Sequence, residues 1–176
     1  MDLTYQSTTT LARIRAASPC KDVWEKLLAH LGKTKADDEP LSLLTVLDSN
    51  GLDDALWVLS FAMPDNRLAR HFQAWCAEQV LHLFEAECPD DMRLRDHIAM
   101  LRNDAADDKD QATARAAALD AARAAARAAE LDAALYAALD AARYVALVAW
   151  AAAGDGARDA AWAAQEKQLR KMIGGV

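Results

Sequence analysis

The stretch QATARAAALDAARAAARAAELDAALYAALDAARYVALVAWAAA, from Gln111 to Ala153, decides the fold class of this chain. Alanine makes up about half of the stretch, which contains neither glycine nor proline. Alanine has the highest intrinsic helix propensity, because it loses no side-chain entropy on folding and buries no polar group. The stretch is therefore predicted to be helical.

The length of this stretch limits how it can fit into the molecule. One continuous helix would span about 60 Å, whereas a compact chain of this size is about 40 Å across. The charged side chains up to Glu130 share one side of the helix, but Asp132 is turned away from them by about 200°. A corner from Ala129 to Asp132, which makes a helical hairpin, is the favoured interpretation. One long, gently twisted helix is the alternative.

The remainder of the chain also has helical patterning, with apolar residues recurring at three- and four-residue steps between turn signals. No segment alternates apolar and polar residues for long enough to predict a sheet. The fold class is therefore all-α, a multi-helix bundle with a long alanine-rich helix or helical hairpin toward the C-terminus. Helix starts are predicted at Ser18-Pro19, Pro40, Asp53-Asp54, Asp65 and Asp90, and helix ends at Gly32, Gly51, Pro64 and Cys88-Pro89.

The domain organisation follows from the same pattern. Residues 1–17 are polar and threonine-rich, and they are predicted to be loosely structured, although Leu11 and Ile14 could belong to a short helix. Residues 18–176 are predicted to form a single all-α domain. Its first part, 18–103, has helices with larger apolar residues, and its second part, 111–176, has the alanine-rich helices.

Composition and charge exclude several classes of protein. The net charge of −7 and the pI near 5.0 argue against direct nucleic-acid binding and against binding to anionic membranes. The longest apolar run, Tyr144 to Ala153, is much shorter than the roughly 20 residues that cross a bilayer. Three cysteines without close spacing fit a reducing compartment. We expect a soluble, cytoplasmic protein without a membrane partner.

The sequence also lacks the usual patterns of catalysis. Its four histidines do not lie in HExxH or in a zinc-type Cys/His cluster, and it has neither a glycine-rich phosphate loop nor GxSxG. We therefore predict no catalytic residues, no metal, no cofactor and no enzymatic activity.

One acidic cluster is the candidate for a binding site. Asp104, Asp107, Asp108 and Asp110 lie between the last large-residue helix and the alanine-rich stretch. The cluster lacks the glycine and terminal glutamate of an EF-hand loop, so calcium is not expected. Two interpretations stay open: a solvated turn, or a contact patch for a protein partner with a basic surface. Asp37 to Glu39 is a weaker candidate of the same kind.

Several distinctive blocks follow one another in a fixed order along the chain. They are Ser18-Pro19-Cys20 followed by Trp24, NGLDDALW at Asn50–Trp57, RLARHFQAWCAEQVLHLFE at Arg67–Glu85, Pro89-Asp90-Asp91 before Arg93 and Arg95, and Trp162-Ala163-Ala164-Gln165 before Leu169. With these blocks and the alanine-rich tract, the chain resembles the bacterial and phage immunity-protein family of the Imm5 type, from about Ser18 to Ile173.

The resemblance implies a protein that binds and neutralises a partner toxin, and it supplies no catalytic residue to transfer. The chain would then be a non-enzymatic inhibitor that occludes the surface of a toxin. An alternative is a phage-encoded, anti-CRISPR-like inhibitor of a host defence complex, acting in the host cytoplasm. A second alternative is a structural, self-assembling helical module, because alanine faces pack readily against copies of themselves; a homodimer is then expected.

Overall fold

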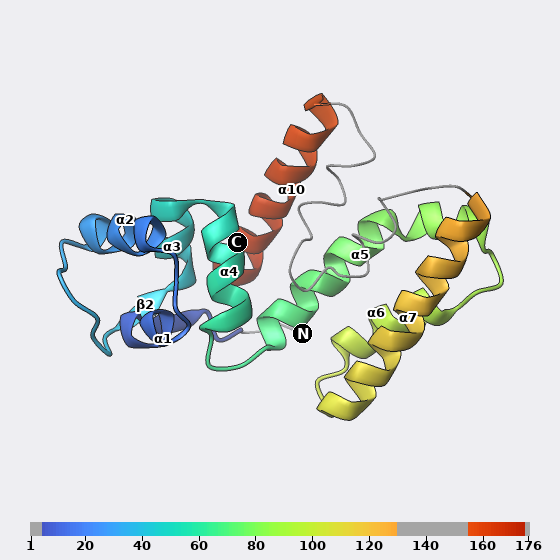
Figure 1. Cartoon of the computed structure of the whole chain (residues 1–176), viewed down its shortest axis with the longest axis horizontal. Helices are drawn as coiled ribbons and strands as arrows, with labels where there is room; N and C mark the ends of the chain where they lie inside the picture. Colours follow the sequence, from blue (N-terminus) through green and yellow to red (C-terminus); the bar gives the residue numbers. More distant parts are fainter. Residues whose placement is uncertain (1–4, 130–154, 175–176) are drawn as a thin grey trace. The chain divides into compact units, whose positions relative to one another are not determined.

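The structure, a computed structural model, describes residues 5–129 and 155–174 (Figure 1). Helices make up most of these residues, and the strands among them form one small two-stranded sheet. The predicted all-α class is confirmed. Gln111 to Ala129 is helical as predicted. The choice between a hairpin and one long helix lies outside the described residues.

The chain divides into two compact units, which are described separately below. One contains Met1–Ala69 and Gln168–Val176, and the other contains Arg70–Lys167. The predicted single domain over 18–176 stays a prediction, because compactness alone does not establish that a unit folds independently.

The first unit is built around helices α3 (Leu43–Asn50) and α4 (Leu52–Phe61). These helices carry fully buried apolar residues such as Leu43, Val46 and Ala55. Burial of such side chains is worth about 25 cal/mol per Å² of apolar surface, so this pair supplies much of the unit's core. The other elements of the unit are β1 (Thr8–Thr10), α1 (Leu11–Ala16), α2 (Lys21–Leu31) and β2 (Pro40–Ser42).

The N-terminal segment differs from its prediction. Instead of being loosely structured, it contains β1, which pairs antiparallel with β2, and α1, which buries Leu11 and Ile14. Each strand has three residues, too few for a period-two pattern to be recognised. The sheet was therefore missed, although threonine favours strands because its side chain is branched at Cβ.

Two helix starts in the first unit were also predicted too early. Helix α2 begins at Lys21, because Ser18 has φ of 60°, whereas an N-cap residue needs extended backbone. Helix α3 begins at Leu43, since Pro40 belongs to a strand, an arrangement that an edge strand tolerates. Ser42 caps α3, its Oγ accepting from the Leu44 N–H at 3.2 Å.

The second unit contains most of α5 (Arg67–Glu87), all of α6 (Arg93–Arg102) and α7 (Asp108–Ala129), and the first part of α10 (Asp155–Gly174). Helices α6 and α7 pack side by side (Figure 1). Small side chains allow two helix axes to approach closely, and α7 contributes the small residues Ala118 and Ala121 to the buried core. The buried core consists of Ala74, Ala77 and Phe84 from α5, Leu94, Ile98 and Leu101 from α6, and Ala118 and Ala121 from α7.

Candidate partner-binding surface

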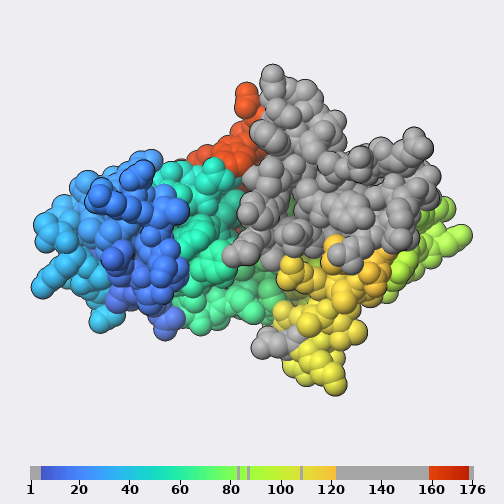
Figure 2. Space-filling model, viewed as in Figure 1, coloured from blue at the N-terminus to red at the C-terminus, as the bar shows by residue number. Residues whose placement is uncertain are grey.

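The four predicted aspartates lie at the turn between α6 and α7 and in the first turn of α7. Residues of this turn, yellow in Figure 2, reach the molecular surface on the face shown. Asp104, Asp107 and Asp110 are exposed there; the side chain of Asp108 lies outside those that the structure describes. The structure therefore brings three predicted carboxylates to one surface turn, but it gives two of them local roles.

Two residues of α5, Arg70 and His71, contact the carboxylate of Asp104. Its Oδ1 accepts a hydrogen bond from Nη2 of Arg70 at 3.3 Å and lies 3.2 Å from Nε2 of His71. The side chains of Arg70 and His71 are each 9% exposed, whereas that of Asp104 is 41% exposed. Asp104 thus fixes the turn to α5 while part of its carboxylate faces solvent.

Arg70 also closes the C-terminal end of α6. Its Nη1 donates to the carbonyl oxygens of Leu101 and Asn103, each at 3.1 Å. The last carbonyls of a helix have no partner within the helix, and they carry its partial negative charge. The Arg70 guanidinium donates to these carbonyls and brings a positive charge to the negative end of the helix, so it stabilises the C-terminal end of α6.

Asp107 is the N-cap of α7. Its Oδ1 accepts from the N–H of Asp110 at 2.7 Å, and its carbonyl accepts from the N–H of Gln111 at 3.0 Å. This is the usual arrangement in which a short polar side chain satisfies a free N–H of the first helical turn. Asp110 itself is exposed and uses only its backbone in this cap.

The residues that sequence reasoning missed are Arg70 and His71. Neither residue belongs to a candidate site predicted from the sequence, yet both are buried. The apolar stripe of α5 gave no signal for Arg70, because a residue two positions from Leu68 and Phe72 lies on the other side of the helix. A buried cation requires a buried acceptor, but the sequence does not show that Arg70 is buried or which acceptor it meets.

At the other end, α6 begins at Arg93 with Met92 as its N-cap, so the predicted start at Asp90 was too early; Asp91 binds the first helical residue. Its Oδ1 accepts from the N–H of Arg93 at 3.1 Å and from Nε of Arg93 at 2.9 Å. The Arg93 guanidinium holds the pKa of the Asp91 carboxyl below its usual range. The two side chains therefore largely neutralise each other.

Among the side chains that the structure describes, no three His, Cys, Asp or Glu residues are grouped as a metal site requires. Within the described ranges, no helix is both long enough and apolar enough to span a membrane.

The fold and the surface turn together define a helical protein that presents carboxylates on a fixed frame. The family model described as "Imm-5 like putative immunity protein" matches residues 63–159, which is more than half of the chain. The chain belongs to this family, and the suspected resemblance is confirmed. Searches of curated proteins and of solved structures gave no match. The matched range contains α6, α7 and all of α5, so family membership rests mainly on the second unit.

Proposed function

We propose that this chain is a non-enzymatic immunity protein that binds a toxin protein and occludes its functional surface. Membership of the Imm-5 like family indicates a role of the immunity type and a protein partner. The net charge of −7 is consistent with a basic partner.

The observation that supports this proposal best is the anchoring of the α6–α7 turn. Arg70 bonds two backbone carbonyls and Asp104, while Asp107 caps α7. A surface that is ordered before binding loses less conformational entropy when the partner docks. Asp110 and the exposed part of Asp104 then provide a negative rim that steers a basic partner and orients it.

The test uses Asp110→Lys, because reversing Asp104 or Asp107 would also disturb the fold. The matched control is Glu25→Lys, which makes the same charge change at an exposed side chain of α2. The partner is recovered from the native host by pull-down and identified by mass spectrometry. We expect Asp110→Lys to weaken its binding about tenfold, mainly through slower association at low salt, with little change in Glu25→Lys.

Other outcomes of these experiments would contradict either the contact surface or the immunity role. Equal affinities of Asp110→Lys and Glu25→Lys would reject this turn as the contact surface. If cells that produce the recovered toxin die whether or not the chain is co-expressed, the immunity role itself is wrong. Recovery of a host defence complex instead of a toxin would favour the anti-CRISPR-like alternative.

The homodimer also stays a prediction, and light scattering over a range of protein concentrations tests it.

A further inference from the structure

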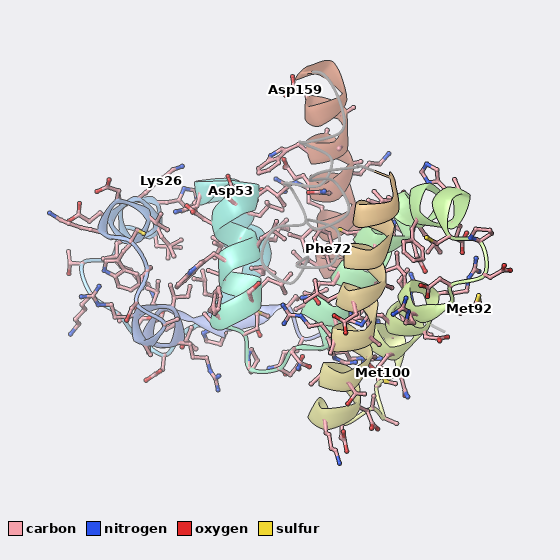
Figure 3. All side chains as sticks on the ribbon, turned by 45° about the vertical axis from the view of Figure 1, so that its right-hand side comes forward. Lys26, Asp53, Phe72, Met92, Met100 and Asp159 are labelled. Carbon is pink, nitrogen blue, oxygen red and sulfur yellow. The ribbon has the colours of Figure 1, made fainter. Side chains whose placement is uncertain are left out.

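The corner between α5 and α6 forms a second feature of the surface, at the opposite end of α6 from the acidic turn. A shallow hollow of about 590 Å³ opens there. Figure 3 labels Met92 at this corner, at the edge of the second unit. The lining residues are Cys88, Pro89, Asp90, Asp91, Met92, Arg93 and Asp96.

Met92 is unusual because it is a large apolar side chain with 49% of its surface exposed. Among the described residues, the other exposed large apolar side chain is Phe61 of the first unit. Met92 has no role in capping α6 through its side chain. A flexible thioether at the surface of a hollow can adapt to an irregular apolar partner surface. The core of α6 is built from other residues, so its stability does not explain the presence of Met92.

The charge around Met92 defines the kind of group that the hollow fits. Three carboxylates line the hollow beside one guanidinium. That guanidinium, on Arg93, is bonded to Asp91. Asp90 and Asp96 are exposed and have no ion-pair partner among the side chains that the structure describes. The hollow therefore offers an apolar contact flanked by two available negative charges.

We infer that this hollow is a docking site for a segment of the partner protein that presents a lysine or arginine next to an apolar side chain. The inference rests on the proposed function, since it names a second contact with the same partner. Charge complementarity selects the cationic segment. The apolar neighbour covers Met92, in the arrangement of an apolar anchor within a polar rim that concentrates binding energy at interfaces.

The first experiment measures binding of the recovered partner to Met92→Ala and to a double variant with Asp90→Asn and Asp96→Asn. We expect Met92→Ala to weaken binding at least about tenfold, mainly through faster dissociation. The double variant should lose part of the salt dependence of association, since Asp104 and Asp110 keep their charges. The matched control is Phe61→Ala, which shortens a similarly exposed apolar side chain in the first unit and should leave the affinity unchanged. Equal affinities of Met92→Ala and Phe61→Ala would overturn the inference.

The second experiment uses the unmodified chain and does not depend on how a variant folds. Cys88 is half-buried in the lining of the hollow, whereas Cys20 is exposed in the first unit. Partner binding should slow alkylation of Cys88 by iodoacetamide several-fold and leave Cys20 unchanged. If Cys88 reacts at the same rate in the complex, the hollow is not covered and the inference is wrong, while the immunity role stands. If the wild-type chain binds no protein partner, the proposed function fails first.

Discussion

Arg70 on α5 and Asp104 in the α6–α7 turn, 34 residues apart in the chain, are joined by a hydrogen-bonded ion pair of 3.3 Å. The carboxylate therefore connects a surface turn to a buried cation. A buried guanidinium without acceptors would be strongly destabilising. The same side chain donates to two backbone carbonyls at the end of α6. Fold stability and the geometry of the candidate surface thus depend on one residue.

Replacement of Arg70 by alanine should be among the most destabilising changes in the second unit. It removes at least three hydrogen bonds and leaves the carbonyl of Leu101 without this donor in a buried position. We expect a loss of about 2–4 kcal/mol in the free energy of unfolding, measured by urea denaturation.

The control for this prediction is Arg102→Ala. Arg102 pairs with Glu78 at 2.6 Å, but both side chains are well exposed, at 49% and 36%. An exposed ion pair of this kind contributes at most about 1 kcal/mol. A similar destabilisation in the two variants would show that burial of Arg70 has no special effect.

The sequence predicted those features that depend on local chemistry. Gly32 and Gly51 end helices, as expected, because each adopts a positive φ that glycine tolerates. The alanine-rich composition correctly predicted helix from Gln111 to Ala129. These signals require only a few neighbouring residues, so a single sequence suffices to recognise them.

Features that depend on contacts across the chain were not predictable. The pairing of Thr9 with Leu41 brings together two short segments about 30 residues apart, and neither has a strand pattern by itself. Likewise, four closely spaced aspartates predicted either a solvated turn or an acidic contact patch, because the pattern cannot show that Asp104 faces Arg70. The structure shows where the four aspartates lie, but the assignment of a partner-binding surface to this turn stays a prediction.

Gly51 should be much less replaceable than Gly32. Gly51 has φ of 94° and ψ of −178° at the junction between α3 and α4, in a region that is essentially restricted to glycine. Gly32 has φ of 64° and ψ of 26°, the left-handed helical region, which other residues enter at a smaller cost.

Thermal unfolding of the two alanine variants tests this difference. We expect Gly51→Ala to lose about 1–3 kcal/mol and Gly32→Ala to lose about 1 kcal/mol. Neither glycine has a neighbouring atom within 4 Å of an added Cβ, so the backbone rather than a clash determines the outcome. A larger loss for Gly32→Ala would contradict this interpretation.

The three thiols should differ in reactivity in the order of their exposure. Cys20 is exposed, Cys88 is half-buried and Cys76 is buried. Burial raises the pKa of the Cys76 thiol, and the thiolate is the reactive form. In the native chain we expect iodoacetamide to modify Cys20 first and Cys76 only after addition of denaturant. Peptide mapping by mass spectrometry would contradict this order if Cys76 reacted as fast as Cys20.

His97 should make the stability of the second unit sensitive to mild acid. It is a half-buried residue of α6, and its Nδ1 is buried without a hydrogen-bond partner in the described part of the chain. Burial lowers the pKa of His97 below its ordinary value of 6.5, and the charge of Arg115 lowers it further. The unfolded chain therefore binds a proton more readily than the folded chain.

The sign of the effect follows from this difference. Above about pH 6.5 the imidazole is neutral in both states, and its titration has no effect on stability. As the pH falls below 6.5 toward the lower pKa of the folded state, the unfolded state gains protons first, so the free energy of unfolding decreases. His97→Gln should remove this part of the pH dependence in urea titrations at pH 7.5, 6.5 and 5.5. His82→Gln, at an exposed position of α5, should retain it; if both variants keep the wild-type slope between pH 7.5 and 5.5, His97 is not the group responsible.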